Sequence, residues 1–526
     1  MTSTAVPSTS TRCNGSMIAS ADQLATQAGM EIFALGGNAV DAAIATNAAL
    51  AVTAPHLCGM GGDLYALVHD GTTVYALNAT GRAGSGSDAA ALRSEGFTSM
   101  PFRHDIRTVT VPGCVDGWIA LHERFGKLPL HQLFAPAVQL ATDGFPASPL
   151  LVGSLKRLDE RGRESLSELA IQAQHPGARV HRPGVARTLR GIAEQGRNSF
   201  YGGEFAEGLY KLGPKLFSES DLAISGAEWV QPLMQKAFSK LLYTIPPNSQ
   251  GYLILGAASL ADQLELPDDP DDPQWAHLLI EAATVAGHDR PEVLHDRADG
   301  QALLNGIAAN LSSVSRVNAS RVRVPTSSGD TTYLCAIDDK RMGVSLIQSN
   351  ASGFGSWLVE PNTQINLHNR GLGFSLAAGH PAELAPGRRP PHTLCPALAT
   401  ERDGSLSAVF GTMGGDGQPQ ILLQLAARLF HHGQSPAVAV NAGRWLLNGP
   451  TTGFDTWTGV GGPHVIVEGQ IASEWNDGLV ARGHEVRVLG PYDTSFGHAH
   501  AIVVEPTGML AGAADPRTVI GSAAGL

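Results

Sequence analysis

The sequence predicts a layered α/β domain, and three observations lead to this fold class. Short stretches rich in β-branched and aromatic residues, typical of strands, occur at residues 64–68 and 73–77. Similar stretches return after residue 331, whereas residues 114–310 show mainly the spacing of helices with one polar face. Because strands stand at both ends of the chain with helices between them, the two halves have to pair to close one core.

The N-terminal part of the chain begins with helices and continues into strands. Residues 20–54 have the alanine-rich composition of buried helices, with an interruption just before Asn38. The Asn38 side chain is expected to cap a helix over residues 41–51. The two stretches at 64–68 and 73–77 then predict a pair of neighbouring strands.

The middle of the chain is expected to be mainly helical. Helical spacing occurs at residues 115–124, 130–143, 185–195, 205–212 and 276–288. An acidic run at residues 266–273 separates the last two, and its proline at every third position excludes a helix interior. Because no histidine or cysteine is interleaved, we interpret this run as a solvated loop and not as a metal site.

The last third of the chain returns to strands. A hairpin begins near Thr331, and further strands are expected at residues 406–410, 464–467 and 502–504. A helix over residues 420–430 follows a turn at Gly414 and Gly415. The chain shows no convincing internal repeat.

Composition and charge exclude several classes of function. A net charge of −12 and a pI near 5.9 give no basic field for nucleic acid. No run reaches the roughly 20 apolar residues of a membrane span, and residues 1–12 lack the basic and apolar parts of a secretion signal. Five widely spaced cysteines without a CxxC pair indicate reduced thiols. We therefore expect a cytoplasmic protein with no cofactor, metal ion, nucleic-acid partner or membrane partner.

The stretch from Gly329 to Asn350 contains the candidate chemistry. Two β-rich runs flank a charged turn, which predicts a β-hairpin centred on Lys340. Antiparallel pairing then places Thr331 opposite Ser349, and directly opposed residues have Cβ atoms roughly 4.5–5.5 Å apart, close enough for their hydroxyls to hydrogen-bond. Threonine and serine are common in hairpins, so the pair alone also has an ordinary structural explanation.

The residues before the hairpin give this pair a chemical interpretation. Residues 312–329 are polar and small, as expected of an exposed loop. A cut between Asp330 and Thr331 would free an α-amine with a pKa of about 7.7–8.0, which is a usable base at neutral pH. A threonine activated by its own terminal amine is an established type of nucleophile.

Short motifs run through nearly the whole chain. They are Gly36-Gly37-Asn38-Ala39-Val40-Asp41-Ala42-Ala43, Gly59-Met60-Gly61-Gly62, Val111-Pro112-Gly113, Asp143-Gly144-Phe145, Thr331-Thr332, Gly414-Gly415 and Ala514-Asp515-Pro516-Arg517. In this order they resemble the γ-glutamyltransferase family, whose members are self-cleaving N-terminal-nucleophile hydrolases. The resemblance implies a four-layer αββα fold in one intertwined domain. It also implies a large chain, residues 1–330 with the helical insertion at about 114–310, and a small chain, residues 331–526. A homodimer is left open.

The resemblance implies roles for four residues. Thr331 is the nucleophile of self-cleavage, at the carbonyl of Asp330, and of substrate turnover. Ser349 falls on a family threonine and is expected to orient the Thr331 hydroxyl. Gly414 and Gly415 follow a strand and precede a helix, where their N–H groups would form an oxyanion hole, each donor contributing roughly 2.7–4 kcal/mol. A purely structural serine and an ordinary glycine turn are the alternatives.

The positions that would bind the substrate's ammonium depart from the family pattern. The family holds this ammonium with an Asn, a Gln and an Asp, and the matching positions here are Ala351, Arg370 and Gly373. All three ammonium acceptors are therefore lost. Arg370 instead places a permanent cation at this point, which suits a carboxylate.

The positions that would bind the substrate's carboxylate are changed as well. The family's serine pair falls on His392 and Thr393, of which Thr393 can still donate a hydrogen bond. His392 is expected to titrate near neutral pH. The family's carboxylate-binding arginine is replaced in register by Thr80, and Arg82 follows two residues later. Either Arg82 or Arg370 could supply the carboxylate clamp.

These departures lead to an expected function and two alternatives. The segment formed by residues 375–387 is shorter than the lid-bearing segment of many family members. In this it resembles the lidless branch of cephalosporin acylase-like and oxamate amidohydrolase-like proteins. The resemblance implies an open site, which favours hydrolysis. We expect an amidohydrolase that releases a carboxylate-bearing acyl group, of the oxamate, succinyl or glutaryl type, from a small-molecule amide. The first alternative is a γ-glutamyl hydrolase or transferase acting on glutathione-like compounds. The second is a non-catalytic binding module on the same fold.

Overall fold

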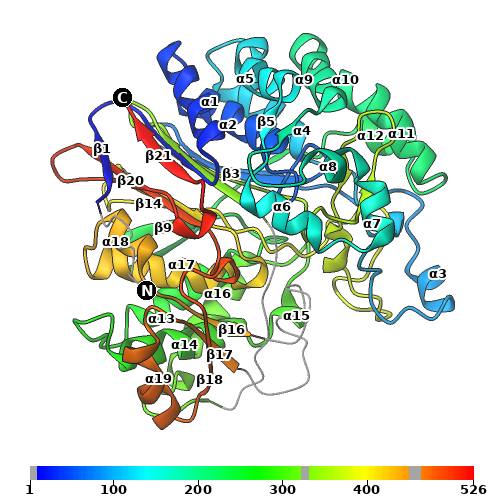
Figure 1. Cartoon of the computed structure of the whole chain (residues 1–526). Coiled ribbons are helices and arrows are strands. Elements are labelled where there is room, and N and C mark those ends of the chain that lie inside the picture. Colours follow the sequence, from blue (N-terminus) through cyan, green and yellow to red (C-terminus); the bar gives the residue numbers. More distant parts are fainter. Residues whose placement is uncertain (1–8, 321–330, 449–463) are drawn as a thin grey trace.

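A computed structural model describes residues 9–320, 331–448 and 464–526. Two seven-stranded antiparallel sheets lie face to face, and helices cover the outer face of each sheet (Figure 1). This four-layer αββα arrangement confirms the predicted fold class. Asp330 and residues 321–329, which are half of the predicted loop at 312–329, lie outside the described residues.

The first sheet contains the predicted hairpin at its centre. Its strands in spatial order are β21 (Ser522–Gly525), β2 (Met17–Ser20), β10 (Thr332–Ile337), β11 (Gly343–Ser349), β3 (Asp63–His69), β4 (Val74–Ala79) and β7 (Glu228–Val230). The hairpin strands β10 and β11 therefore lie between β2 and β3, which come from before Thr331. The two halves of the chain share one hydrogen-bonded sheet.

The second sheet is shared between the two halves in the same way. Its strands in spatial order are β1 (Thr11–Cys13), β20 (Leu510–Ala513), β19 (Ala499–Val504), β15 (Leu406–Thr412), β14 (Ala397–Thr400), β9 (Lys240–Thr244) and β8 (Leu233–Ala237). Strands β1, β8 and β9 precede Thr331, and the others follow it. Neither sheet can form from one half alone.

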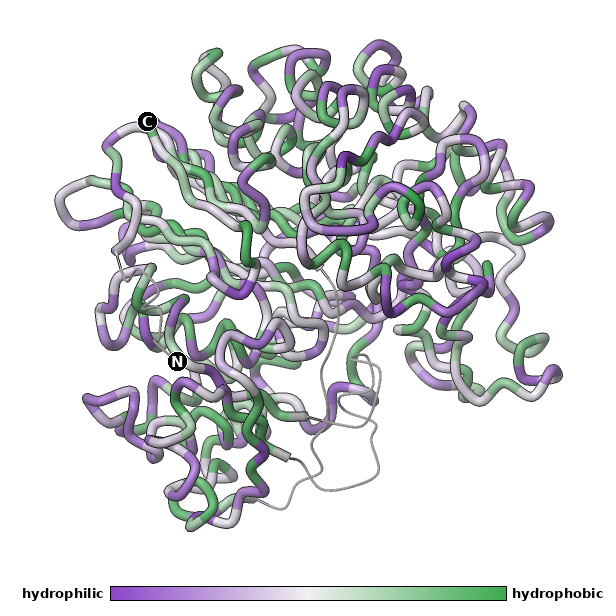
Figure 2. Tube along the Cα trace, in the orientation of Figure 1, coloured by the Kyte–Doolittle hydropathy of each residue, from purple (hydrophilic) through white to green (hydrophobic). Residues whose placement is uncertain are grey.

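The faces of the two sheets meet in an apolar layer. Successive side chains of a strand point to opposite faces, so Tyr333 and Cys335 of β10 face the second sheet while Leu334 and Ala336 face the helices. Hydrophobic stretches accordingly run along the strands of both sheets (Figure 2). β10 is buried on both faces along its whole length.

Helices form the two outer layers. On the first sheet lie α1 (Gln23–Ala34), α2 (Ala39–Thr53), α4 (Cys114–Phe125), α5 (Leu130–Asp143) and α9 (Pro183–Gln195). On the second lie α13 (Tyr252–Ala261), α14 (Pro273–Gly287) and α17 (Gln418–Ala426). The predicted cap of α2 is confirmed: Asn38 Oδ1 accepts the Asp41 N–H at 2.9 Å, and the Asp41 carboxylate accepts the Asn38 N–H.

The predicted helices of the middle region are all found. Residues 130–143 form α5, and the other four predicted stretches form α4, α9, α11 (Glu204–Leu212) and α14. Smaller helices complete this region: α6 (Pro149–Lys156), α7 (Glu160–Ser165), α8 (Ser167–Gln172), α10 (Arg197–Tyr201), α12 (Glu219–Ala223), α15 (Arg290–Val293) and α16 (Gly300–Ala309). The acidic run is a loop as far as Asp272, which caps α14, and Pro273 is the first helical residue, where its missing N–H costs nothing.

Five strands within this mainly helical region were not predicted. β5 (Phe145–Pro146) and β6 (Arg179–Val180) form a small two-stranded sheet, whereas β7, β8 and β9 extend the two large sheets at their edges. β8 and β9 form a short hairpin, and β9 finds its second partner in β14, far along the chain. Such brief strands are specified by the sheet that they join more than by their own sequence.

A small third sheet lies beside α14 and α19 (Ala472–Ala481). It consists of β16 (Trp445–Asn448), β17 (His464–Glu468) and β18 (Glu485–Leu489). The strands predicted at 406–410, 464–467 and 502–504 correspond to β15, β17 and β19. In the described part of the chain, no helix combines the length and apolar character needed to cross a bilayer.

Candidate active site

The predicted hairpin register is confirmed. Thr332 pairs with Gln348 and Ile337 pairs with Gly343, so Thr331, just before β10, comes opposite Ser349 at the end of β11. Thr331 Oγ1 lies 3.0 Å from Ser349 Oγ. Both residues are buried, because β10 and β11 are covered on both faces. The fold therefore holds two hydroxyls in hydrogen-bond contact at the start of the central hairpin.

Two further groups orient the Ser349 hydroxyl. The Ala351 N–H donates to Ser349 Oγ at 2.8 Å, and Arg370 Nη2 donates to it at 3.2 Å. A hydroxyl has two acceptor positions and one proton. With two donors directed at Ser349, its own proton is favourably placed to point toward Thr331 Oγ1.

Arg370 connects the hydroxyl pair to Thr393. Arg370 begins the short helix Arg370–Gly373, is 1% exposed, and donates from Nη1 to Thr393 Oγ1 at 2.9 Å. Burial lowers the pKa of Arg370 to about 10, partly offset by the Asp63 carboxylate. The side chain is thus protonated at neutral pH and forms a fixed, desolvated cation between Ser349 and Thr393.

Asp63 supplies the counter-charge and was not identified from the sequence. It is the first residue of β3, directly opposite Ser349 in the sheet. Its Oδ1 accepts the Gly81 N–H at 2.9 Å, and its Oδ2 lies 3.4 Å from His392 Nε2. Burial raises its pKa, but His368, His392 and the Gly81 N–H outweigh that effect and lower the pKa to about 2. The available signal was its position directly after Gly59-Met60-Gly61-Gly62.

His392 belongs to this cluster, but the expected titration near neutral pH is wrong. Its Nδ1 accepts the Leu394 N–H at 3.3 Å, and its ring packs edge-on against Tyr65 with ring centres 5.0 Å apart. Burial and the charge of Arg370 lower the pKa of His392 to about 3, although the Asp63 carboxylate opposes them. His392 is therefore neutral at pH 7 and acts as a hydrogen-bonding group.

The glycine turn is joined to the same cluster through Gln250. Gly414 has φ 138° and Gly415 has φ 54°, a region that favours glycine. Gln250 Nε2 donates both to the Gly415 carbonyl at 3.2 Å and to the Thr393 carbonyl at 2.8 Å. The turn predicted from Gly414 and Gly415 thus lies next to Thr393.

The Arg82 side chain makes its contacts away from Thr331 and Ser349. Its Nη2 pairs with Glu228 Oε1 at 2.5 Å, and its Nη1 donates to the Gly387 carbonyl at 3.1 Å. Both side chains of this ion pair are partly exposed. Of the two predicted clamp arginines, only Arg370 contacts the hydroxyl pair.

The structure also gives a steric reason for the lost ammonium acceptors. A Cβ atom at Gly373 would lie 2.1 Å from the Pro391 carbonyl oxygen, so an aspartate cannot be accommodated there without moving the backbone. Ala351 has a left-handed backbone, with φ 75°, and offers only its N–H to the site. Neither Ala351 nor Gly373 therefore provides a side-chain acceptor for an ammonium.

A cavity of about 440 Å³ adjoins the cluster. Its wall includes Ser352 and Gly353, which follow Ser349 closely in sequence, and Met413, which precedes Gly414. Thr331 and Ser349 themselves are not among its lining residues. The remaining lining residues are His56, Leu57, Phe102, Arg103, Pro149, Leu150, Gly153, Ser154, Arg157, Leu158, Phe354, Trp357, Asp493, Thr494, Ser495 and His498. Arg103 stacks over the Trp357 ring at 3.7 Å, which leaves an aromatic and cationic wall.

Comparison with known proteins shows similarity along nearly the whole chain. The gamma-glutamyltranspeptidase family model matches residues 25–525. The chain is 36% identical over 524 residues to the oxamate amidohydrolase proenzyme of Klebsiella pneumoniae subsp. pneumoniae, covering 95% of this chain and 97% of that protein. It is 33% identical over 521 residues to the glutathione hydrolase-like YwrD proenzyme of Bacillus subtilis, with 95% and 97% covered. The crystal structure of cephalosporin acylase from Bacillus halodurans superposes with a TM-score of 0.89 at 32% identity, covering 100% of this chain and 98% of that one.

Proposed function

This chain belongs to the gamma-glutamyltranspeptidase family. On that basis we propose that it is an amidohydrolase that cleaves its own peptide bond before Thr331 and then hydrolyses small-molecule amides. The observation that carries the proposal is the 3.0 Å contact between Thr331 Oγ1 and Ser349 Oγ, with the Arg370 cation beside it. Both sequence relatives are named as proenzymes, which supports a precursor that is processed.

In self-cleavage the Thr331 hydroxyl is the nucleophile, before its α-amine is free. Thr331 Oγ1 attacks the carbonyl carbon of Asp330 and loses its proton, and the C–N bond then breaks. The acyl group passes to oxygen as an ester, while the Thr331 nitrogen takes up a proton and becomes a free amine. Water then hydrolyses the ester and leaves a carboxylate on Asp330. Ser349 orients the attacking hydroxyl through its hydrogen bond. The products are a large chain, residues 1–330, and a small chain, residues 331–526.

Substrate turnover repeats this chemistry with the new amine as base. The Thr331 amine takes the proton of its own hydroxyl as Oγ1 attacks the substrate amide. The developing oxyanion is stabilised by N–H groups of the Gly414–Gly415 turn. The protonated amine then gives its proton to the leaving nitrogen, and water hydrolyses the acyl ester.

The acyl group is proposed to carry a carboxylate and no ammonium. Arg370 and Thr393 present donors beside the hydroxyl pair, and a carboxylate accepts from such donors. An ammonium finds no aspartate at Gly373, where the Pro391 carbonyl leaves no room. Oxamate, succinyl and glutaryl amides fit this description, and one relative is an oxamate amidohydrolase.

A γ-glutamyl substrate is the second candidate. The glutathione hydrolase-like relative favours it, since it covers the chain to the same extent. The adjoining cavity, with its aromatic and cationic wall, is proposed to hold the leaving group in either case. Transfer to an acceptor amine in place of water would use the same acyl ester.

The first test is the intact mass of the denatured protein, compared with Thr331→Ala. Wild type is expected to give two fragments that divide between Asp330 and Thr331, whereas the variant stays whole. Thr332→Ser is the matched control, because it changes the neighbouring buried threonine and should still be cut. A single uncut chain in wild type would remove the proposed base and favour a non-catalytic binding module.

The second test is a panel of acyl anilides with the processed enzyme. Glutaryl and succinyl anilides, together with oxamate, are expected to be better substrates than γ-glutamyl anilide. Faster release from γ-glutamyl than from glutaryl anilide would contradict the assignment of Arg370 and select the glutathione-like alternative.

Location and assembly are further parts of the proposal. All five cysteines are buried and none forms a disulfide, which fits a reducing compartment. We therefore propose the cytoplasm, to be tested by cell fractionation. A homodimer of the processed protein is to be tested by its mass in solution.

A further inference from the structure

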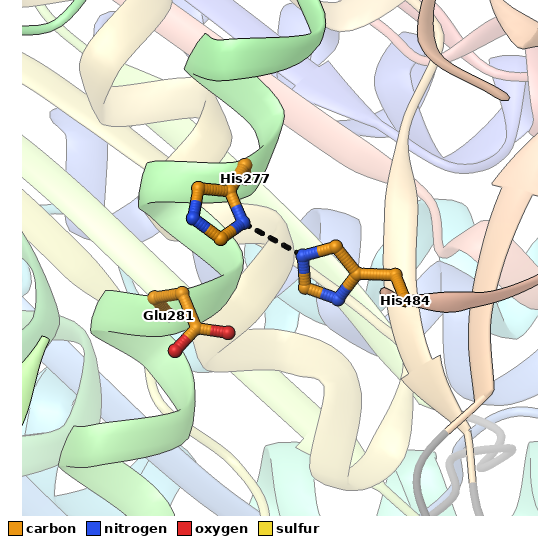
Figure 3. A group of neighbouring side chains, drawn as sticks. All are labelled: His277, Glu281 and His484. Atoms are coloured by element: carbon orange, nitrogen blue, oxygen red, sulfur yellow. Dashed lines mark hydrogen bonds between the residues drawn. The ribbon is translucent and has the colours of Figure 1, made fainter. Parts of the chain in front are cut away.

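Three titratable side chains meet at a buried point in the helical layer outside the second sheet. His277 and Glu281 lie one turn apart on α14, so they share one face of that helix. His484 approaches from the opposite side, from the connection between α19 and β18 (Figure 3). One ligand atom from each lies within 4.8 Å of the others. His277, Glu281 and His484 are hereafter the histidine–glutamate cluster.

Hydrogen bonds within the described part of the chain only partly satisfy this cluster. His277 Nδ1 lies 2.8 Å from His484 Nε2, and Glu281 Oε1 accepts the Ser320 N–H at 3.0 Å. Glu281 Oε2 is buried and has no hydrogen-bond partner among the described residues. Leaving buried polar atoms unpaired is costly, and each such atom calls for an explanation.

We propose that His277, Glu281 and His484 bind one transition-metal ion, with Zn²⁺ the best match. Two imidazole nitrogens and one carboxylate oxygen are a common zinc donor set, and a water molecule would complete a tetrahedron. Imidazole ligands select zinc and its neighbours over Mg²⁺ and Ca²⁺, which prefer oxygen. The two nitrogens at 2.8 Å have to separate by a few tenths of an ångström to bind the same ion, since Zn–N distances are about 2.0–2.1 Å.

The charges around the cluster are compatible with a bound cation. Burial lowers the pKa of both histidines to about 4, so their rings are neutral at pH 7, as ligands must be. Arg482 is the nearest cation, but its guanidinium is held by Gln274 Oε1 at 2.8 Å and by the Gly478 carbonyl at 2.8 Å. Burial raises the pKa of the Glu281 carboxyl, and a bound divalent ion would favour its charged form.

The position of the site gives it a structural role. His277 and Glu281 precede Thr331, whereas His484 follows it, so the ion would cross-link the two segments of the chain. The site also neighbours Ser320, whose N–H is bound by Glu281. None of the three ligands contacts Thr331, Ser349 or Arg370 among the described residues. The ion is therefore expected to stabilise the fold without entering the amide chemistry.

The test uses full-length protein without an affinity tag, stripped with a chelator and titrated with ZnSO₄ alone. We expect one Zn²⁺ per chain by elemental analysis, and a melting temperature that rises with zinc concentration because zinc binds the folded state. Co²⁺ in place of Zn²⁺ should give the visible absorption of a tetrahedral site. Far less than one ion per chain at saturation, or no change in melting temperature, would overturn the proposal.

Variants locate the ion. His484→Asn and Glu281→Gln each remove one ligand. Removing a residue that only supports a ligand already weakens metal binding roughly 10- to 100-fold, so each of these variants should lose at least that much zinc affinity. His484 is the less buried of the two histidines, so its replacement is the one expected to fold normally. His288→Gln, at the end of the same helix, is the control and should bind zinc as wild type does. Unchanged zinc affinity in a folded His484→Asn protein would refute the assignment.

Discussion

Replacing Arg370 by methionine is expected to change the substrate preference of the enzyme. The Arg370 guanidinium is 1% exposed and donates to Thr393 Oγ1 and Ser349 Oγ, so a substrate carboxylate beside it would be bound by a charged donor away from water. Hydrogen bonds to charged groups contribute about 1.5–3 kcal/mol. At about 1.4 kcal/mol per factor of ten, the variant should lose roughly 12- to 140-fold in discrimination.

The assay is a ratio of two kcat/KM values, one for glutaryl and one for pentanoyl p-nitroanilide. These acyl groups have equal length and differ in the terminal carboxylate, so the ratio cancels any effect of Arg370 on Ser349 and Thr331. Arg82→Met is the matched control: its partly exposed pair with Glu228 should contribute little, and the ratio should stay within about threefold of wild type. An equally small change in processed Arg370→Met would refute carboxylate binding by Arg370.

Three further predictions concern orientation, pH and stability. Ser349→Ala should slow self-cleavage and lower kcat by roughly a hundredfold, measured from fragment yield over time and from turnover, whereas Ser349→Thr should restore both. Because the pKa of His392 is about 3, His392 does not ionise near neutral pH, and kcat/KM should rise with pH through one ionisation at about 7.7–8.0, that of the Thr331 amine. His392→Gln should leave the midpoint of this pH profile in place. A shift of the midpoint by a full pH unit in this variant would contradict the assignment of the ionisation to the amine. Asp515 lies between two buried arginines that hold its carboxyl pKa well below the usual range, although burial raises it. Asp515→Asn should lower the free energy of unfolding, measured by urea denaturation, by about 3–5 kcal/mol at pH 7. This difference between wild type and variant should shrink as the pH falls below about 4, where the wild-type carboxyl is protonated on unfolding.

Local pattern predicted the contact between Thr331 and Ser349. In the hairpin, the turn at Lys340 sets the register, and the register places Thr331 opposite Ser349. Asn38 at the start of α2 is another local signal, since a capping side chain needs only its own next turn. Both depend on residues close together in sequence.

The remainder of the site depends on contacts that no local pattern encodes. Asp63, Arg370 and His392 come from three separate segments and meet only when both sheets have formed. Their mutual burial, and not their residue types, moves the His392 pKa away from neutrality. The histidine–glutamate cluster shows the same limit: His277 and Glu281 have helical spacing, but His484 is 207 residues from His277.

The interleaved sheets constrain how the protein is made. Within the described part of the chain, β2 pairs with β10 and β21, and β1 pairs with β20, so the earliest strands to leave the ribosome find their partners in the second half of the sequence. At a synthesis rate of about 5–20 residues per second, β2 waits roughly 15–60 s for β10 to be made. During that time the nascent chain has unpaired edges in both future sheets, which makes it a substrate for chaperones. The last strands β20 and β21 complete the pairing, so a premature stop that removes only the final segment would leave β1 without β20 and β2 with β10 alone.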